Sequence, residues 1–385
     1  MRLLLLVLAL VQFGQRPPLS PAETLLEPAV LRAINEAPTG AAAVAVIQGS
    51  DSAAGEVVLS CRPGQCDIAS QAAQKLQSLV SAAKLAQPSR TIRIVSAIDS
   101  NTFPRAKAAL HIAQGEPRGL QIVRSPWSTA GIADEVVEIF SRQGSYSVDV
   151  RPYENVGQLG WDTYGVPTTT IVTSTALSNQ HAAAVAAASA YFLATLPNTG
   201  AEPLLSHLMV GAHARLAEDG RKAVAQMGSQ QRAGADVLIM FTHAIEREQR
   251  RMRSFERFMP MPVDPMLRSR LADMEKGITS VWTSMGITSS PFVPAAERIR
   301  GRGGEDRRVP LRLRDGPLPS PDPPTAMLKY PNVADVIYEL GNFIDGKRSI
   351  SDIRDAVSAE FGPVALPVVV DYFERLAKAG AVSIR

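Results

Sequence analysis

This 385-residue sequence has only two cysteines, and aromatic residues make up just 5% of it. Its formal net charge is +3, which is too small to indicate a polyanionic partner by itself. It contains no G-x-S-x-G motif and no evident Ser-His-Asp spacing, so nothing indicates a nucleophilic hydrolase. With 45% hydrophobic and 20% charged residues, the composition predicts a soluble globular protein of two or three domains.

The N-terminus carries one positive charge at Arg2 and then an apolar run that reaches Val11, followed by polar residues. This run is too short to span a bilayer. It predicts a signal peptide over residues 1–21, so we expect an exported protein, periplasmic or extracellular, with no stable membrane span after cleavage. An uncleaved anchor or a buried helix is the alternative.

Export bears on the two cysteines, Cys61 and Cys66, which flank a turn-forming Arg-Pro-Gly-Gln segment. In an oxidising compartment they could close a small loop as a disulfide, which the spacing permits without requiring it. A zinc pair is the rival interpretation, and it lacks the two further Cys or His ligands that such a site needs nearby.

Segments with strand and helix patterns alternate between residues 40 and 197, which predicts an α/β fold with a mainly parallel sheet and helices on both faces. The expected strands are residues 41–47, 56–59, 91–98, 120–124, 148–151 and 168–173, and the expected helices are residues 22–36, 69–84, 103–113, 132–142 and 179–196. The helix over 103–113 carries His111, which is more often a surface or packing residue than a ligand.

Two acidic residues bracket the most informative stretch, residues 60–101. Asp67 lies where a loop enters a helix, and Asp99 lies where the buried strand Thr91–Ile98 ends. In open α/β sheets function collects at the carboxyl ends of strands, so Asp99 is a candidate for a reacting group.

Three segments carry a family resemblance: Asp67-Ile-Ala-Ser-Gln before a long helix, the strand Arg90-Thr-Ile-Arg-Ile-Val95, and Gly165-Val-Pro-Thr168. They resemble the di-zinc aminopeptidases of metallopeptidase family 28, over roughly residues 40–197. The resemblance implies a zinc-exopeptidase-like fold. It places Asp67 at the zinc-bridging aspartate and Asp99 near the catalytic or zinc-binding glutamate, and Asp162 is the remaining candidate ligand.

The sequence departs from the family where its zinc histidines are expected. The stretch Ala43–Ser52, matched to the family's early H-x-D strand, has Gln48 and Gly49 instead, and the loop with the last histidine is missing after Val172. Zinc sites normally take three or more protein ligands, and carboxylates alone favour magnesium or calcium. The sequence therefore predicts a peptidase scaffold without its zinc.

Beyond this domain, assigned to residues 22–200, composition predicts a helical extension over residues 201–293 and a Pro/Gly/Arg-rich linker over residues 294–328. Residues 329–385 predict three helices, with Ser351 as a plausible cap of the second. Their pattern resembles the winged-helix-like modules at the ends of long family members. Such modules can also bind DNA, but export argues against nucleic acid.

Two functions remain open. The first is an exported, non-catalytic relative of the aminopeptidases that binds a peptide or protein, or serves as a scaffold, and needs no cofactor. The alternative is an active zinc-dependent aminopeptidase, in which Asp67 and Asp162 hold the metal and Asp99 activates water. The missing histidines favour the first function, and the sequence does not indicate an oligomeric state.

Overall fold

The structure is a computed structural model. The chain folds into two compact units. One unit comprises Leu19–Leu208 and Arg250–Asp264, and the other comprises Met1–Pro18, Met209–Gln249 and Pro265–Arg385. The described residues are 28–40, 43–51, 53–98, 103–115, 119–144, 146–154, 160–196, 201–228, 234–258, 306–314, 316–319 and 322–385, with 269, 272, 273 and 276. The predicted signal peptide and Asp99 lie outside them.

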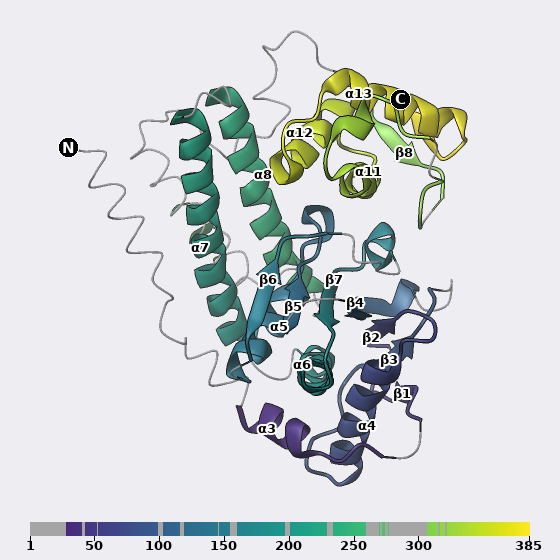
Figure 1. The fold of residues 1–385 in the computed structure, drawn as a ribbon, viewed down its shortest axis with the longest axis vertical. Coiled ribbons are helices and arrows are strands. Elements are labelled where there is room, and N and C mark those ends of the chain that lie inside the picture. Colours follow the sequence, from purple (N-terminus) through teal and green to yellow (C-terminus); the bar gives the residue numbers. More distant parts are fainter. Residues whose placement is uncertain are drawn as a thin grey trace, which may run out of the picture. The chain divides into compact units, whose positions relative to one another are not determined.

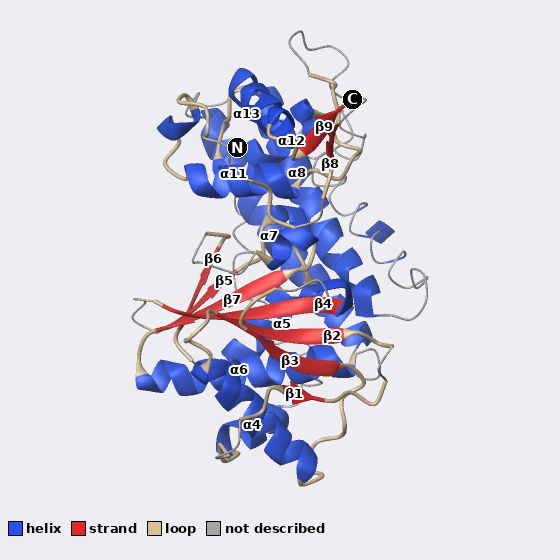
Figure 2. Cartoon of the chain, turned by 90° about the vertical axis from the view of Figure 1, so that its right-hand side faces the viewer, coloured by secondary structure: helices blue, strands red, loops and turns tan. Residues whose placement is uncertain are grey.

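A seven-stranded sheet forms the centre of the first unit, in the order β1-β3-β2-β4-β7-β5-β6 (Figure 2). The strands are β1 (Val46–Ile47), β2 (Glu56–Cys61), β3 (Thr91–Val95), β4 (Ala106–Gln114), β5 (Leu120–Val123), β6 (Val148–Arg151) and β7 (Thr168–Thr173). Strands β3, β2, β4 and β7 run parallel, whereas β1 and β5 pair antiparallel with β3 and β7. The predicted α/β fold with a mainly parallel sheet is confirmed.

Helices α3 (Pro28–Glu36), α4 (Asp67–Ser81), α5 (Ile132–Gln143) and α6 (Ala176–Thr195) pack together, and α4, α5 and α6 also pack against this sheet (Figure 1). Helix α6 contacts the other three, and its alanines from Ala182 to Ala188 are fully buried. Small side chains let neighbouring backbones approach closely, which suits a helix surrounded by others. A capping box between Thr175 and Ser178 fixes its first turn.

One predicted element is wrong. The helix expected over Phe103–Ala113 is only a short 3₁₀ turn, Phe103–Arg105, followed by the nine-residue strand β4. Its alanines favour a helix in isolation, but β4 pairs with β2 on one side and β7 on the other. Tertiary pairing and burial outweigh local propensity here, and the omitted strand is the central one.

The predicted helical region after residue 201 consists of α7 (Ala201–Gly228) and α8 (Gly234–Arg253), and the 3₁₀ helix η4 (Ser254–Phe258) follows. Buried ion pairs join the first two helices. Arg215 contacts Glu248 at 2.9 Å, and Arg247 contacts Asp219 at 2.9 Å. Because such pairs lose stability when misaligned, they favour one register of the two helices.

The C-terminal module consists of β8 (Pro310–Arg312), α11 (Val333–Asn342), α12 (Ile350–Phe361), α13 (Leu366–Lys378) and β9 (Val382–Ile384). Strands β8 and β9 pair antiparallel, so a segment expected to be linker supplies a strand. The cap of α12 is Ser349 rather than the predicted Ser351. The Ser349 hydroxyl accepts a hydrogen bond from the Asp352 N–H, and the Asp352 carboxylate accepts one from the Ser349 N–H.

Among the described helices, none is by itself long and apolar enough to cross a membrane. The bent pair α12 and α13 passes that criterion only when the two helices are combined, by length and composition.

A buried carboxylate fixes α5 within the first unit. Asp134 accepts hydrogen bonds from the N–H and hydroxyl of Ser125 and from the hydroxyl of Thr169, at 2.7–3.0 Å. The guanidinium of Arg251 lies 3.1 Å away, and both charged side chains are almost fully buried. Helix α5 is thereby joined to the last turn of α8, which carries Arg251, and to β7, which carries Thr169.

Replacing Asp134 with Ala should destabilise this unit strongly, because it removes a buried carboxylate that pairs with the Arg251 guanidinium and accepts three hydrogen bonds. We expect a loss of about 3–5 kcal/mol in the free energy of unfolding, measured by urea denaturation. Asp371→Ala, which breaks an exposed pair with Arg375 on α13, is the control and should leave the transition unchanged. Equal effects of the two variants would contradict the assignment.

Candidate functional site

The carboxyl ends of β2 and β4 mark the place where an open α/β sheet usually binds ligands. The chain leaves β2 through α4 and returns as β3 on one side of β2, whereas after β4 it continues to β5, which lies beyond β7 on the other side of β4. Connections thus depart in opposite directions from two adjacent parallel strands, and open α/β sheets usually bind ligands at the carboxyl ends of such a pair.

A disulfide closes the end of β2. Cys61 is the last residue of β2 and Cys66 is the N-cap of α4, and their sulfur atoms are bonded at 2.04 Å. The turn between them is closed by the Gln65 N–H, which donates to the Arg62 carbonyl at 2.9 Å. Gly64 lies in the turn with a positive φ of 76°, a conformation that glycine adopts without strain.

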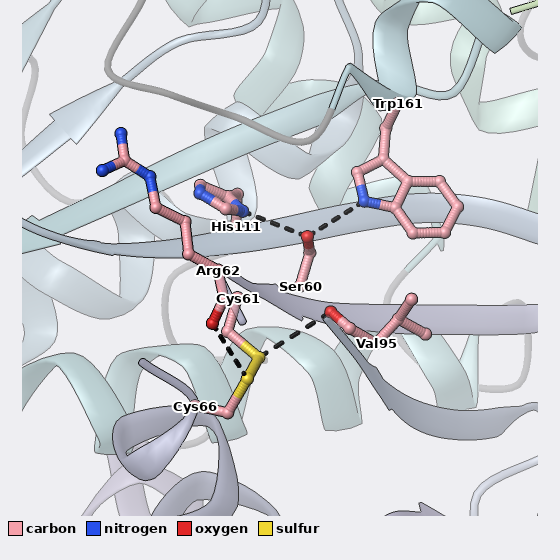
Figure 3. The surroundings of a disulfide bond; sticks show 7 residues. All are labelled: Ser60, Cys61, Arg62, Cys66, Val95, His111 and Trp161. Atoms are coloured by element: carbon pink, nitrogen blue, oxygen red, sulfur yellow. Dashed lines mark hydrogen bonds between the residues drawn. A yellow bond between two sulfur atoms is a disulfide. The ribbon is translucent and has the colours of Figure 1, made fainter. Parts of the chain in front are cut away.

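On the opposite face of β2, three side chains form a chain of hydrogen bonds (Figure 3). Ser60 and His111 are partners in the register of β2 and β4, and Ser60 Oγ lies 3.0 Å from His111 Nδ1. The Trp161 indole N–H donates to the same Ser60 oxygen at 3.0 Å. The serine hydroxyl proton is therefore available to donate to His111 Nδ1, and all three side chains are completely buried.

Burial, followed by the positive charge of Arg62, lowers the pKa of His111 to about 4. The imidazole is therefore neutral at pH 7. Its Nε2 atom is buried without a hydrogen-bond partner among the described residues, as is the Thr170 hydroxyl of β7, the register partner of His111. A serine and a neutral histidine are thus paired, but neither side chain reaches solvent, so this pair is a contact of the core.

The two predicted metal ligands that the structure describes, Asp67 and Asp162, lie in different environments. Asp67 is the first residue of α4 and is exposed, where its charge is favourable at the helix N-terminus. Asp162 is 2% exposed in the 3₁₀ helix η3 (Trp161–Tyr164), and its carboxylate accepts the Thr129 hydroxyl at 2.7 Å. Asp67 follows the carboxyl end of β2, whereas Asp162 precedes the amino end of the parallel strand β7. Trp161, beside Asp162, contacts Ser60, whereas Cys66, beside Asp67, is bonded to Cys61 on the opposite face of β2 (Figure 3).

The described residues at the carboxyl end of β2 do not form a site that could bind a zinc ion. Within them, no three His, Cys, Asp or Glu side chains form a group able to hold a metal. The sulfur atoms of Cys61 and Cys66 are bonded to each other, so neither is a thiolate ligand. Arg62 brings a positive charge to the same loop, which disfavours a cation there.

Sequence reasoning missed Ser60, His111 and Trp161 as a group because the segment carrying His111 was expected to be helical. One signal could have found it: residues 106–114 form a short apolar run between Pro104 and Gly115, a length more typical of a buried strand. Even so, the pairing of His111 with Ser60 depends on strand register, which sequence does not give.

Comparisons with known proteins add little. No protein-family profile matches the chain, and no curated protein matches it. Among solved structures, one described as a "putative peptidase" of Clostridium acetobutylicum aligns with 88% of this chain at 13% identity and a TM-score of 0.25. This chain spans 59% of that protein's length. At this TM-score the likeness is too weak to support an argument about this chain.

The burial of His111 predicts a pH dependence of stability. The pKa of His111 is about 4 in the fold against an ordinary value of 6.5, so between these values only the unfolded chain takes up the proton. Stability should therefore fall as the pH is lowered from 6.5 to 4, by on the order of 3 kcal/mol from this residue. Urea denaturation at several pH values measures the effect. His111→Gln should show a shallower slope, and an unchanged slope would contradict the prediction.

The disulfide predicts a measurable stabilisation, because it closes a loop between residues that are five apart in sequence. Reduction of the wild type should lower the free energy of unfolding by about 2 kcal/mol. The matched control is Cys61→Ala/Cys66→Ala, whose urea midpoint should not respond to reductant. Free thiols titrated in the unfolded, unreduced protein would show that the bond is absent.

Proposed function

We propose that this chain is an exported protein with an aminopeptidase-like scaffold that no longer binds zinc and acts as a non-catalytic binding or scaffold protein for a peptide or another protein. The observation that carries the proposal is the state of the β2 carboxyl end, where the Cys61–Cys66 disulfide and Arg62 occupy the loop that enters α4.

The position of β2 strengthens this argument. The stretch Ala43–Ser52, matched from sequence to the family's H-x-D strand, contains only the two-residue edge strand β1, antiparallel to β3. The strand that leads into α4 is β2, so the first zinc histidine of the family would be expected just after it. Residues 61–66 there read Cys-Arg-Pro-Gly-Gln-Cys, which offers no imidazole and no carboxylate.

Export receives support from the same disulfide, because structural disulfides persist mainly in oxidising compartments. We propose that the signal peptide expected over residues 1–21 directs the chain to such a compartment. For the C-terminal module, we propose a packing or peptide-binding role of a winged-helix-like domain. Its three helices and its β8–β9 pair support that assignment.

Metal content and hydrolysis test the loss of catalysis. Purified mature protein should hold no stoichiometric zinc by mass spectrometry, and it should not hydrolyse aminoacyl anilides or dipeptides with zinc added, because the β2 end lacks ligands. Asp67→Asn is the informative variant, and Asp371→Asn on the C-terminal module is its matched control. Near-stoichiometric zinc with hydrolysis that is lost only in Asp67→Asn would overturn the proposal and establish the aminopeptidase.

A further inference from the structure

One edge of the sheet in the first unit ends in a strand whose side chains are exposed. Strand β6 is last in the strand order and pairs only with β5 among the described residues. The side chains of Asp149 and Arg151 are 54% and 52% exposed, and Val150 is 37% exposed. An exposed edge strand presents backbone N–H and C=O groups that can pair with another strand.

The direction of these backbone groups follows from one hydrogen bond. The Arg124 N–H donates to the Arg151 carbonyl at 3.1 Å, so Arg151 directs its backbone groups toward β5. Groups of successive residues alternate in direction along a strand. Val148 and Val150 therefore direct their N–H and C=O groups outward, away from the sheet.

The sequence around Val150, Val148-Asp-Val-Arg-Pro152, is complementary to itself when two copies run antiparallel. With the two-fold axis at Val150, this residue exchanges N–H and C=O bonds with Val150 of the partner subunit. The Val148 N–H donates to the carbonyl of Pro152 of the partner subunit. Proline has no N–H to leave unpaired at that position.

The charges fit the same register. In this register Asp149 would lie directly opposite Arg151 of the partner subunit, and Arg151 would lie opposite Asp149 of the partner subunit. Within one copy the two side chains are already 2.6 Å apart on one face of the strand. Pairing therefore builds a cluster of alternating sign, and opposite charges across strands stabilise a sheet. The exposed Val150 side chains meet on the other face.

We propose that β6 joins two copies of this chain in a two-fold symmetric dimer, in which the two sheets become continuous. Strand β6 has four residues, so the contact is smaller than a standard interface of about 1,600 Å². The dimer is therefore weak and dissociates on dilution. This inference does not rest on the absence of zinc or on any ligand.

Sedimentation velocity on the full mature chain tests the dimer, over roughly 1 to 200 µM, which brackets the dissociation constant of a small interface. The wild type should show a reversible monomer–dimer equilibrium that weakens as salt is added. Asp149→Arg and Arg151→Asp each place like charges opposite one another, so each should weaken the dimer about tenfold or more. The double variant Asp149→Arg/Arg151→Asp restores opposite charges and should restore the dimer.

Arg375→Asp is the matched control, since it reverses a charge in another exposed pair, on α13, and should leave the equilibrium unchanged. Val150→Pro tests the backbone pairing, because it removes an outward N–H that β5 does not use. A wild type that stays monomeric over this range would overturn the proposal. So would a dimer that survives the single charge reversals, or one that the double variant fails to restore.

Discussion

The pairing of β4 between β2 and β7 is the constraint on which the centre of this protein depends. A strand with neighbours on both sides and packing on both faces must find partners for its polar groups inside the sheet. The Nδ1 atom of His111 meets this condition through Ser60, and Ser60 is in turn bonded by the Trp161 indole. The indole also packs over Val58 and Ala109, so one side chain serves both the hydrophobic cluster and the hydrogen-bond chain.

The same arrangement defines the chemical character of the β2 end. Cys61, beside Ser60, turns to the opposite face and is bonded to the cap of α4. Arg62 adds a positive charge that helps to keep His111 neutral. A strand end that is closed by a disulfide and carries a cation is suited to fixing the entry of a helix, and it offers little to a metal ion. These features are why a binding or scaffold role is the better supported proposal.

Charged residues are used in two ways in the first unit. Asp134 and Arg251 are buried and held by several hydrogen bonds, so their removal is costly and their pairing fixes how α5 packs against the last turn of α8. Asp149 and Arg151 are exposed at the sheet edge, where each adds little to the stability of one copy. At an edge, however, the sign and order of charges determine which strand can pair with it, and here the order matches itself.

Periodicity and β-branched runs were enough to predict the α/β class, the strands β2, β3, β5, β6 and β7, and the helices α4, α5 and α6, because each matches the local preference of its residues. Local preference failed at β4, whose alanines favour a helix until two strands flank them, and at β8, whose three residues pair with β9 about 70 positions away. The cysteine spacing allowed the Cys61–Cys66 bond, but only the turn at Gly64 brings the sulfur atoms together. The contact of His111 with Ser60, the separate environments of Asp67 and Asp162, and the outward direction of Val150 were decided by strand register and order. These are long-range properties, and no local sequence pattern encodes them.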